Sequence, residues 1–456
     1  MKEQASTCQY ENGLRLIHIP SPTDVAYCGI SIDAGTRDEE SGEEGMAHFC
    51  EHMMFKGTEK RRAWHIINRM EAVGGDLNAY TNKEETVVYS AFMKEHFERA
   101  AELIFDIVFH STYPQHEIDK ECEVIIDEIE SYNDSPSELI YDHFENIIFK
   151  GSSLGHDILG TEDNVRRFST EDAVRFRDRL YRPDKMVFFI FGNIDFKKAQ
   201  KTIAKLAASP VVASETNSDT NRHGTEGNDC TDMEDEKGCT KGQVGRETKQ
   251  DERSDADKGS DTSTCDPALT NSPTAGTHIE QRGTHQAHVM IGRTGYGSKS
   301  DKRIALYFLN NLIGGPGMNS RLNIALREHT GLVYTVESIL TNYTDTATWG
   351  IYFGCDAKDV DRCLKLIRKE LDKLMDKPLN EKELKAAIKQ IKGQIGVACD
   401  NFENYALDTA KAYLHYNRFE GVEDTFRHLE QLTPAILQEV AKEMFDPAKL
   451  TTLIFT

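Results

Sequence analysis

A chain of 456 residues is too long for one ordinary hydrophobic core, so its length predicts two domains of about 200 residues each. Its formal net charge of −22 argues against a nucleic acid as partner. No apolar run approaches the ~20 residues that cross a bilayer, and residues 1–8 lack the apolar stretch of a secretory signal. No two of the ten cysteines form a Cys-x-x-Cys pair, which favours free thiols. We therefore expect a cytoplasmic protein without membrane insertion; a signal removed before this sequence begins is the alternative.

The first half of the sequence mixes strand and helix signals. Short stretches rich in β-branched and aromatic residues predict strands, and longer amphipathic stretches predict helices. We expect strands over residues 8–20, with a turn at 12–13, and over 26–34, 86–92 and 186–192. We expect helices over residues 47–55, 62–73 and much of 94–180.

The second half shows the same mixture of signals. Its expected strands cover residues 286–292, 333–341 and 347–355, and its expected helices cover 302–313, 319–329, 358–375 and 380–416. Residues 292–300 resemble a phosphate loop, but Ser298 separates the last glycine from Lys299, so we predict an ordinary Gly-rich turn. Runs of strands beside runs of helices indicate α+β domains.

The two halves end on a repeated pattern. Pro183 and Lys185 precede an apolar strand in the first half, and Pro447 and Lys449 precede the strand predicted over 451–455. The two prolines lie 264 positions apart. Each half therefore closes with a helix, a Pro-x-Lys turn and a final strand, which predicts two similar domains.

Residues 213–278 differ from the rest of the chain. They contain no Phe, Tyr, Trp or Ile, and carry 15 acidic and 7 basic residues. Such a segment buries too little apolar surface to offset its chain entropy, so we expect an unstructured acidic linker that is dispensable for folding. A solvated linker is favoured over a regulatory or partner-binding segment. The predicted domains are accordingly 1–212 and 279–456.

The helix expected over residues 47–55 carries the pattern His48-x-x-Glu51-His52. A helix places the two histidines one turn apart at i and i+4, with Glu51 on the same face. Two imidazoles at this spacing can ligate one zinc ion, and a neighbouring carboxylate can deprotonate a water molecule. The alternative is a buried helix with two structural histidines and a surface glutamate. Cys50 lies off the His/Glu face and is expected in the core.

A catalytic zinc site needs a third protein ligand. Residues 120–130 predict a helix that places Glu121 and Glu128 on one face, together with Val124 and Ile125. Carboxylates among aliphatic residues suggest that a cation lies opposite. The alternative is a solvated acidic stripe, and such a stripe is expected on another face, from Glu123, Asp127 and Glu130.

With these motifs the chain resembles the pitrilysin family of zinc metallopeptidases, the inverzincins, and in particular its short mitochondrial and bacterial members. The resemblance covers nearly the whole chain except residues 213–278. Glu128 follows His52 by 76 residues, as the distal ligand of the family does. The other matching motifs are Gly74-Gly75-x-Leu77-Asn78-Ala79-x-Thr81, Ser320-Arg321-Leu322, Leu326-Arg327-Glu328 and Gly331-Leu332-x-Tyr334.

The resemblance implies a zinc site in the domain of residues 1–212. By this resemblance His48, His52 and Glu128 bind zinc, Glu51 is the general base, and Glu121 is an auxiliary acidic residue. Zinc would polarise the scissile carbonyl, while Glu51 would carry the proton to the leaving amine.

The resemblance also implies substrate contacts and an assembly. Asn78 and Ala79 match the edge strand along which an extended peptide is laid. Arg327 and Tyr334, in the domain of residues 279–456, would clamp the substrate backbone and stabilise the oxyanion. In the family, two such chains form a clamshell around a closed chamber, so this chain is expected to form one half of it, as a homodimer or in a heterodimer with a related subunit.

These implications predict a zinc endopeptidase that degrades peptides or small unfolded polypeptides. Two alternatives stay open: a non-catalytic scaffold subunit, and an active subunit that works only with a catalytically silent partner. Scaffold relatives lose metal ligands, whereas His48, His52 and Glu128 are all present here, which disfavours the scaffold.

Overall fold

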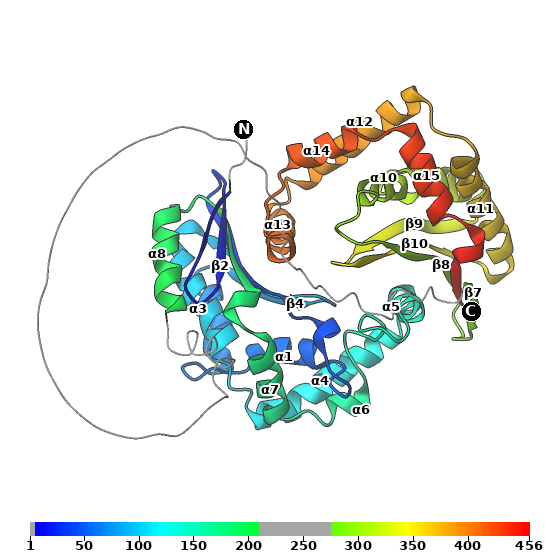
Figure 1. Cartoon of the computed structure of the whole chain (residues 1–456). Helices are drawn as coiled ribbons and strands as arrows, with labels where there is room; N and C mark the ends of the chain where they lie inside the picture. The colour runs from blue at the N-terminus through cyan, green and yellow to red at the C-terminus, as the bar shows by residue number, and fades with distance from the viewer. Residues whose placement is uncertain (1–4, 209–274) are drawn as a thin grey trace, which may run out of the picture.

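The computed structural model describes residues 5–208 and 275–456, which form two halves, each built around one sheet (Figure 1). The six-stranded sheet has the order β1-β2-β6-β3-β5-β4, and the five-stranded sheet has the order β7-β11-β8-β10-β9. The strands are β1 (Ser6–Gln9), β2 (Arg15–Pro20), β3 (Val25–Ile32), β4 (Asp76–Thr81), β5 (Thr86–Met93), β6 (Met186–Gly192), β7 (Gly276–Glu280), β8 (Ala287–Tyr296), β9 (Val333–Asn342), β10 (Thr346–Cys355) and β11 (Thr451–Phe455). The expected α+β class is confirmed.

Apart from the additional edge strand β1 of the first sheet, the two sheets share one connectivity, as the predicted repeat requires. β6 pairs parallel with β2, β11 pairs parallel with β7, and all other neighbouring strands pair antiparallel. The short helices η3 (Pro183–Lys185) and η8 (Pro447–Lys449) precede β6 and β11 and carry the repeated prolines. Each half therefore closes with a strand inserted inside its sheet.

Two sequence predictions in the second half need correction. The Gly-rich turn expected over residues 292–300 is wrong at its start, because β8 continues to Tyr296. A Cβ at Gly292 would lie 2.0 Å from the carbonyl oxygen of Trp349, so this glycine serves close strand approach and not a turn. Most of the predicted linker lies outside the described residues, but β7 begins at Gly276 and so includes its last three positions.

Helices cover both sheets. The helix expected over residues 380–416 is divided in two, because Asn401 caps a new helix by accepting a hydrogen bond from Asn404 N. In the first half the helices are α1 (Met46–Met54), α2 (Ala63–Glu71), α3 (Phe97–Phe109), α4 (Gln115–Asn133), α5 (Pro136–Ile148), α6 (Glu162–Val165), α7 (Thr170–Leu180) and α8 (Phe196–Ala207). In the second half they are α10 (Arg303–Gly314), the π-helical turn η6 (Asn323–Glu328), α11 (Val360–Asp376), α12 (Glu381–Ala398), α13 (Phe402–Tyr416), α14 (Val422–Glu430) and α15 (Pro434–Met444).

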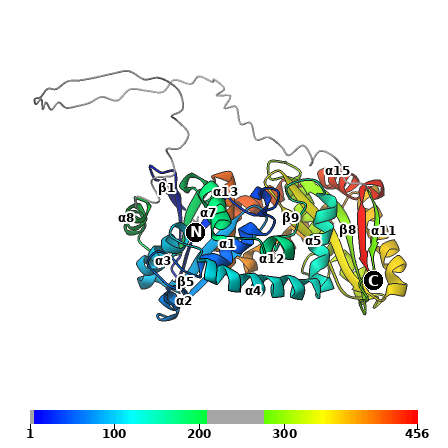
Figure 2. The ribbon, with the colours of Figure 1, turned by 90° about the horizontal axis from the view of Figure 1, so that it is seen from below.

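The two halves exchange one helix each. α5 follows α4 out of the first half and lies against the second sheet (Figures 1 and 2). There Phe144 joins Met290 and Phe455 in one core cluster. In return, α13 packs on the first sheet, where the ring of Phe402 stacks 5.3 Å from that of Phe191. Each sheet is thus covered on both faces, which explains why every residue of β6 is buried. The predicted boundaries at 212 and 279 therefore do not separate the two halves in space.

Two further sequence expectations concern cysteines and membranes. Within residues 5–208 and 275–456 the cysteines are free thiols. No helix in these ranges is both long enough and apolar enough to cross a bilayer.

The exchanged helix α13 is held by a buried carboxylate, which permits a prediction. Glu85 lies 3.2 Å from Lys411 Nζ and 3.4 Å from His415 Nε2. Burial alone would raise the pKa of Glu85, but its contacts with His415 and Lys411 outweigh burial and lower it from 4.5. A lowered folded-state pKa contributes stability that is present above pH 4.5 and is lost as the pH falls through the folded-state value.

We therefore expect Glu85→Gln to lose about 3 kcal/mol of unfolding free energy at pH 7, because the buried carboxylate that pairs with Lys411 and contacts His415 loses its charge. Below pH 4.5 the difference from the parent should shrink. Urea unfolding at several pH values measures both effects. A difference that stays constant as the pH falls would contradict the assigned charge pairing.

Candidate metal centre

The helix α1 starts where the loop before it provides a cap. Gly45 adopts a left-handed conformation with φ of 98°, and a Cβ there would approach Leu159 O to 2.7 Å. The carboxylate of Glu39 accepts hydrogen bonds from the backbone N–H of Gly45 at 3.0 Å and of Ala47 at 2.8 Å. These bonds satisfy donors that the first turn leaves unpaired and place a negative charge at the positive end of the helix.

One face of α1 anchors it in the core. Phe49, Cys50 and Met53 are fully buried, and the Cys50 thiol points to Ala173 O at 3.8 Å. The expectation that Cys50 belongs to the core and not to a metal site is confirmed. His48, Glu51 and His52 occupy the other face, so core packing fixes the direction in which they point.

His48 and His52 meet Glu128 of α4 to form a cluster suited to a metal ion. Their Nε2 atoms lie 3.9 Å and 3.6 Å from Glu128 Oε2, and one ligand atom from each residue lies within 4.8 Å of the others. Tetrahedral zinc with bonds of about 2.1 Å sets its ligand atoms about 3.4 Å apart, so a small contraction would suffice. The Glu128 side chain is 45% exposed and has room to make it. In the described part of the chain no other cluster of His, Cys, Asp and Glu has this geometry.

Glu121, also on α4, forms a hydrogen bond with His52 through the ring nitrogen that does not face Glu128. Its Oε1 accepts a hydrogen bond from His52 Nδ1 at 2.9 Å, and its Oε2 lies 2.5 Å from Lys56 Nζ. This bond leaves the Nε2 lone pair of His52 facing Glu128, as a carboxylate behind a metal-binding histidine does. Lys56 is a site residue that sequence reasoning missed, although it stands at i+4 from His52. Val124, expected beside these carboxylates among buried aliphatic residues, is instead 51% exposed.

The pKa values of the two histidines suit a cation-binding site. Burial, assisted by the neighbouring His52, lowers the pKa of His48 to about 3, so His48 is neutral at pH 7 and can donate a lone pair to a metal. Burial also acts to lower the pKa of His52, but Glu121, Glu51 and Glu128 outweigh it and raise that pKa. The same negative surroundings that favour a proton on His52 would favour a metal ion in its place. The residues present therefore fit zinc.

Glu51 lies between the cluster and the strand β4. Burial, with a smaller contribution from Glu128, raises the pKa of Glu51. Thr81, at the end of β4, donates a hydrogen bond to Glu51 Oε2 at 2.7 Å and thereby opposes the rise. Sequence reasoning quoted Thr81 only as part of a motif and missed this contact.

The strand β4 is the edge of the first sheet. It pairs with β5 alone, with Asn78 opposite Tyr89 and Ala79 opposite Val88, so its other edge offers backbone donors and acceptors for an added strand. Because β4 ends at the residue that contacts Glu51, an added strand would run toward the metal cluster.

Arg327 and Tyr334 lie together in the second half. Arg327 is in η6, and its guanidinium carbon lies 5.8 Å from the ring centroid of Tyr334 at the start of β9. Tyr334 is 82% exposed. Both line a hollow between η6, β9, α10 and α12. Among the contacts of the described residues, none joins either side chain to His48, His52 or Glu128.

The position of this hollow in the second half corresponds to the position of the metal cluster in the first half. α10 lies between β8 and β9 as α1 lies between β3 and β4, and it contacts α12 as α1 contacts α4. At the positions of the motif, with the same spacing, α10 carries Tyr307, Asn310 and Asn311. The histidines and the glutamate of the motif are thus replaced by a tyrosine and two amides.

The supporting contacts are retained between the replaced residues. Asn311 donates a hydrogen bond to Gln394 of α12 at 2.9 Å, at the place where the second motif histidine meets the α4 carboxylate. Ser338 of β9 donates to Asn310 at 2.6 Å, as the β4 threonine donates to the motif glutamate. Neutral amides satisfy each other without a cation, so these motif positions of the second half carry no charged or imidazole ligand.

The bond from Glu121 predicts a specific loss in metal binding. Glu121→Gln should weaken zinc affinity by about 10- to 100-fold, because a neutral amide is a weaker acceptor for the His52 Nδ1–H than the carboxylate and its NH2 group can displace that contact. Competition with a zinc indicator would measure the change. Asp127→Asn is the matched control, since it removes an exposed charge from the same helix. Equal losses in both variants would mean that general charge, and not the Glu121–His52 contact, sets the affinity.

Comparisons with known proteins identify the family of both halves. The sequence model of "Insulinase (Peptidase family M16)" matches residues 16–162, which include the metal cluster, and that of "Peptidase M16 inactive domain" matches residues 248–391, which include most of the amide-substituted copy. The chain therefore belongs to peptidase family M16, and the resemblance inferred from its motifs is confirmed.

Relatives and solved structures extend over almost the whole chain. It is 27% identical to the "Uncharacterized zinc protease YmxG" of Bacillus subtilis over 96% of this chain and 95% of the relative. It is 28% identical to the human "Mitochondrial-processing peptidase subunit beta" over 96% of this chain and 81% of that protein. A protease from Helicobacter pylori has the same fold, with a TM-score of 0.81 at 20% identity over 100% of this chain and 99% of the other.

Proposed function

We propose that this chain is a zinc-dependent endopeptidase that hydrolyses peptides or small unfolded polypeptides. The observation that carries the proposal is the His48, His52 and Glu128 cluster with the half-buried carboxylate of Glu51 beside it. Relatives named zinc proteases support a peptidase of this class. A scaffold role would not require a complete ligand set in one half beside an amide-substituted set in the other.

The residues of the first half would have distinct roles in such a reaction. His48 and His52, through Nε2, and Glu128, through its carboxylate, would hold the zinc ion. When bound, zinc acts as a Lewis acid that polarises a carbonyl and makes a water molecule more acidic. Glu51 accepts the proton of the attacking water and passes it to the leaving amine, a role for which a raised pKa is suited.

The substrate would lie as an extended strand along β4. Backbone pairing at Asn78 and Ala79 reads no side chain, which agrees with low sequence preference. Pairing at this edge leads the peptide toward Thr81 and Glu51. Binding geometry and chemistry would thus depend on the same strand.

We further propose that the site is completed by a second chain. Arg327 and Tyr334 sit in the hollow of the second half and make no contact with the zinc-binding residues described for their own chain. In a dimer that closes a chamber, the pair from one chain would face the zinc site of its partner. A homodimer would contain two such sites, and a heterodimer with a catalytically silent subunit is the alternative.

Metal removal tests the proposed function. The purified chain should bind one zinc ion per chain and cleave an unfolded polypeptide at several positions. A chelator should abolish cleavage, and added zinc should restore it. The fragments, identified by mass spectrometry, would define the cleavage preference. A zinc-loaded chain that cleaves no unfolded polypeptide, alone or with a related subunit, would favour the scaffold role.

A further inference from the structure

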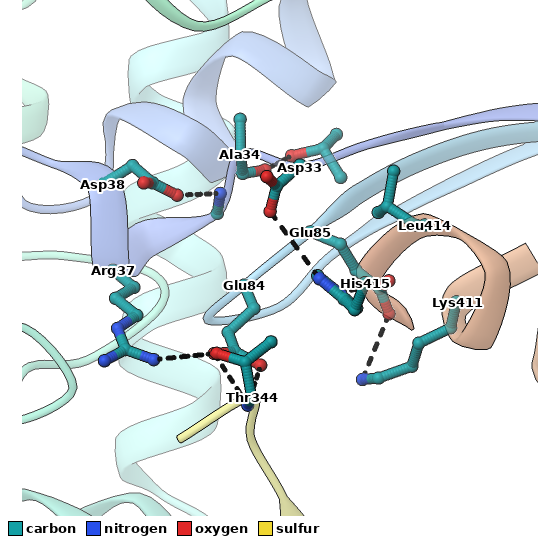
Figure 3. A network of polar contacts seen from close by, with 12 residues as sticks. Asp33, Ala34, Arg37, Asp38, Glu84, Glu85, Thr344, Lys411, Leu414 and His415 are labelled. Atoms are coloured by element: carbon teal, nitrogen blue, oxygen red, sulfur yellow. Dashed lines mark hydrogen bonds and ion pairs between the residues drawn. The ribbon is translucent and has the colours of Figure 1, made fainter. Parts of the chain in front are cut away.

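The tip of the β4–β5 hairpin carries three consecutive buried charges. Lys83, Glu84 and Glu85 are only 3%, 5% and 1% exposed. Each contacts a different segment. Lys83 Nζ donates to Leu154 O. Glu84 reaches Thr344 of the second half, and Glu85 contacts Lys411 of α13 (Figure 3). Buried charges are costly unless paired, so three in a row at a hairpin tip indicate a fixed junction.

Glu84 makes the contact between hairpins of the two halves. The loop between β9 and β10 presents Thr344, whose hydroxyl donates to Glu84 Oε1 at 2.7 Å and whose backbone N–H lies 3.0 Å from Glu84 Oε2. Arg37 of the first half donates to Glu84 Oε1 at 2.7 Å (Figure 3). It also donates to Asp345 Oδ1 at 2.9 Å, and so bridges the two carboxylates. The two hairpin tips are therefore joined by charge-assisted hydrogen bonds from both sides.

The junction is connected rigidly to the candidate active site. Asn82 separates Thr81 from the buried charges, and its side-chain oxygen accepts the backbone N–H of Glu84 and of Glu85, each at 2.9 Å. Its carbonyl oxygen accepts the backbone N–H of Thr36 at 3.2 Å. A shift at Glu84 would therefore be transmitted through this turn to Thr81, which donates to Glu51.

We propose that Glu84 is a positioning residue: by joining the β4–β5 hairpin to Thr344 of the second half, it holds Thr81 in register with Glu51 and fixes the edge of β4. The expected effect on catalysis rests on the proposed peptidase function. The claim that Glu84 holds the β4–β5 hairpin in place does not depend on that function. Its physical basis is that catalytic groups must be held within a fraction of an ångström, which requires a supporting shell that cannot move.

A matched pair of variants separates this role from general stabilisation. Thr344→Val removes the hydroxyl that reaches Glu84. Thr348→Val removes a hydroxyl that also spans the halves, also at 2.7 Å, but reaches Glu145 of α5. Both should fold and keep their zinc, since neither residue touches the metal cluster. Only Thr344→Val should lower kcat, by about tenfold, with KM changed by less than about twofold.

Backbone hydrogen exchange gives a readout that needs no activity. Exchange in residues 76–86 should rise in Thr344→Val and stay at the parent level in Thr348→Val. Unchanged exchange in Thr344→Val would overturn the proposal even if the protein proved not to be a peptidase. A parent chain without peptidase activity would instead overturn the proposed function and leave the exchange experiment to decide on the junction.

A double-mutant cycle tests the route through Thr81. In a Thr81→Val background, where the bond to Glu51 is already lost, Thr344→Val should lower kcat by less than about twofold. If Thr81→Val and Thr344→Val each lowered kcat by the same factor whether or not the other was present, Thr344 would act by another route, and the proposal would be overturned.

Discussion

Replacement of Glu51 by glutamine is expected to leave zinc binding intact and to slow peptide hydrolysis by at least about a hundredfold. The physical reason is that glutamine keeps the shape of the side chain but cannot take a proton from water. Glu51 is not one of the three clustered ligands, so its loss should not release the metal. Zinc content and kcat, measured on the same preparation, test both halves of this expectation.

Glu128→Gln is the informative comparison, because it alters a ligand carboxylate and keeps Glu51. It should lower zinc content, and its residual activity should follow the zinc that remains. Wild-type turnover by Glu51→Gln would show that another group is the base. Loss of zinc from Glu51→Gln would instead mean that Glu51 belongs to the ligand set.

Mixing two inactive variants is expected to restore activity if the site is shared between chains. Glu51→Gln lacks the proposed base, and Tyr334→Phe lacks the proposed oxyanion donor, whose removal should cost about 100-fold or more. In a symmetric dimer assembled from both, one of the two sites in each mixed dimer combines an intact Glu51 with an intact Tyr334. Random assembly should therefore recover about a quarter of the parent activity.

The controls for this experiment are the two variants measured alone and mass measurement of the mixed dimers. If mixed dimers form and no activity returns, each chain must complete its own site. If the chain stays monomeric but active, the second-chain proposal fails altogether. If it becomes active only with a related subunit, the heterodimer alternative gains support.

The features that depend on local spacing could be predicted from the sequence. Two histidines and a glutamate at i, i+4 and i+3 must share one face wherever α1 is helical, because helix periodicity is a property of the backbone. Likewise the two Pro-x-Lys turns could be recognised as a repeat without knowing where their strands pair. The helix pattern of residues 120–130 offered Glu121 and Glu128 as candidates for a third ligand, but the choice of Glu128 came from family resemblance, since that carboxylate comes from another helix.

Which residues support that site, and how the halves are joined, depends on packing between segments that are distant in the sequence. The contacts of Glu121 with His52 and of Thr81 with Glu51 join segments distant in the chain, and they depend on how α4 and β4 pack against α1. The exchange of α5 and α13 left no local signal, because an apolar helix face does not specify which sheet it covers. The amide-substituted copy in α10 also could not be recognised from the sequence. Its residues correspond to the metal cluster only when the two sheets are compared strand by strand.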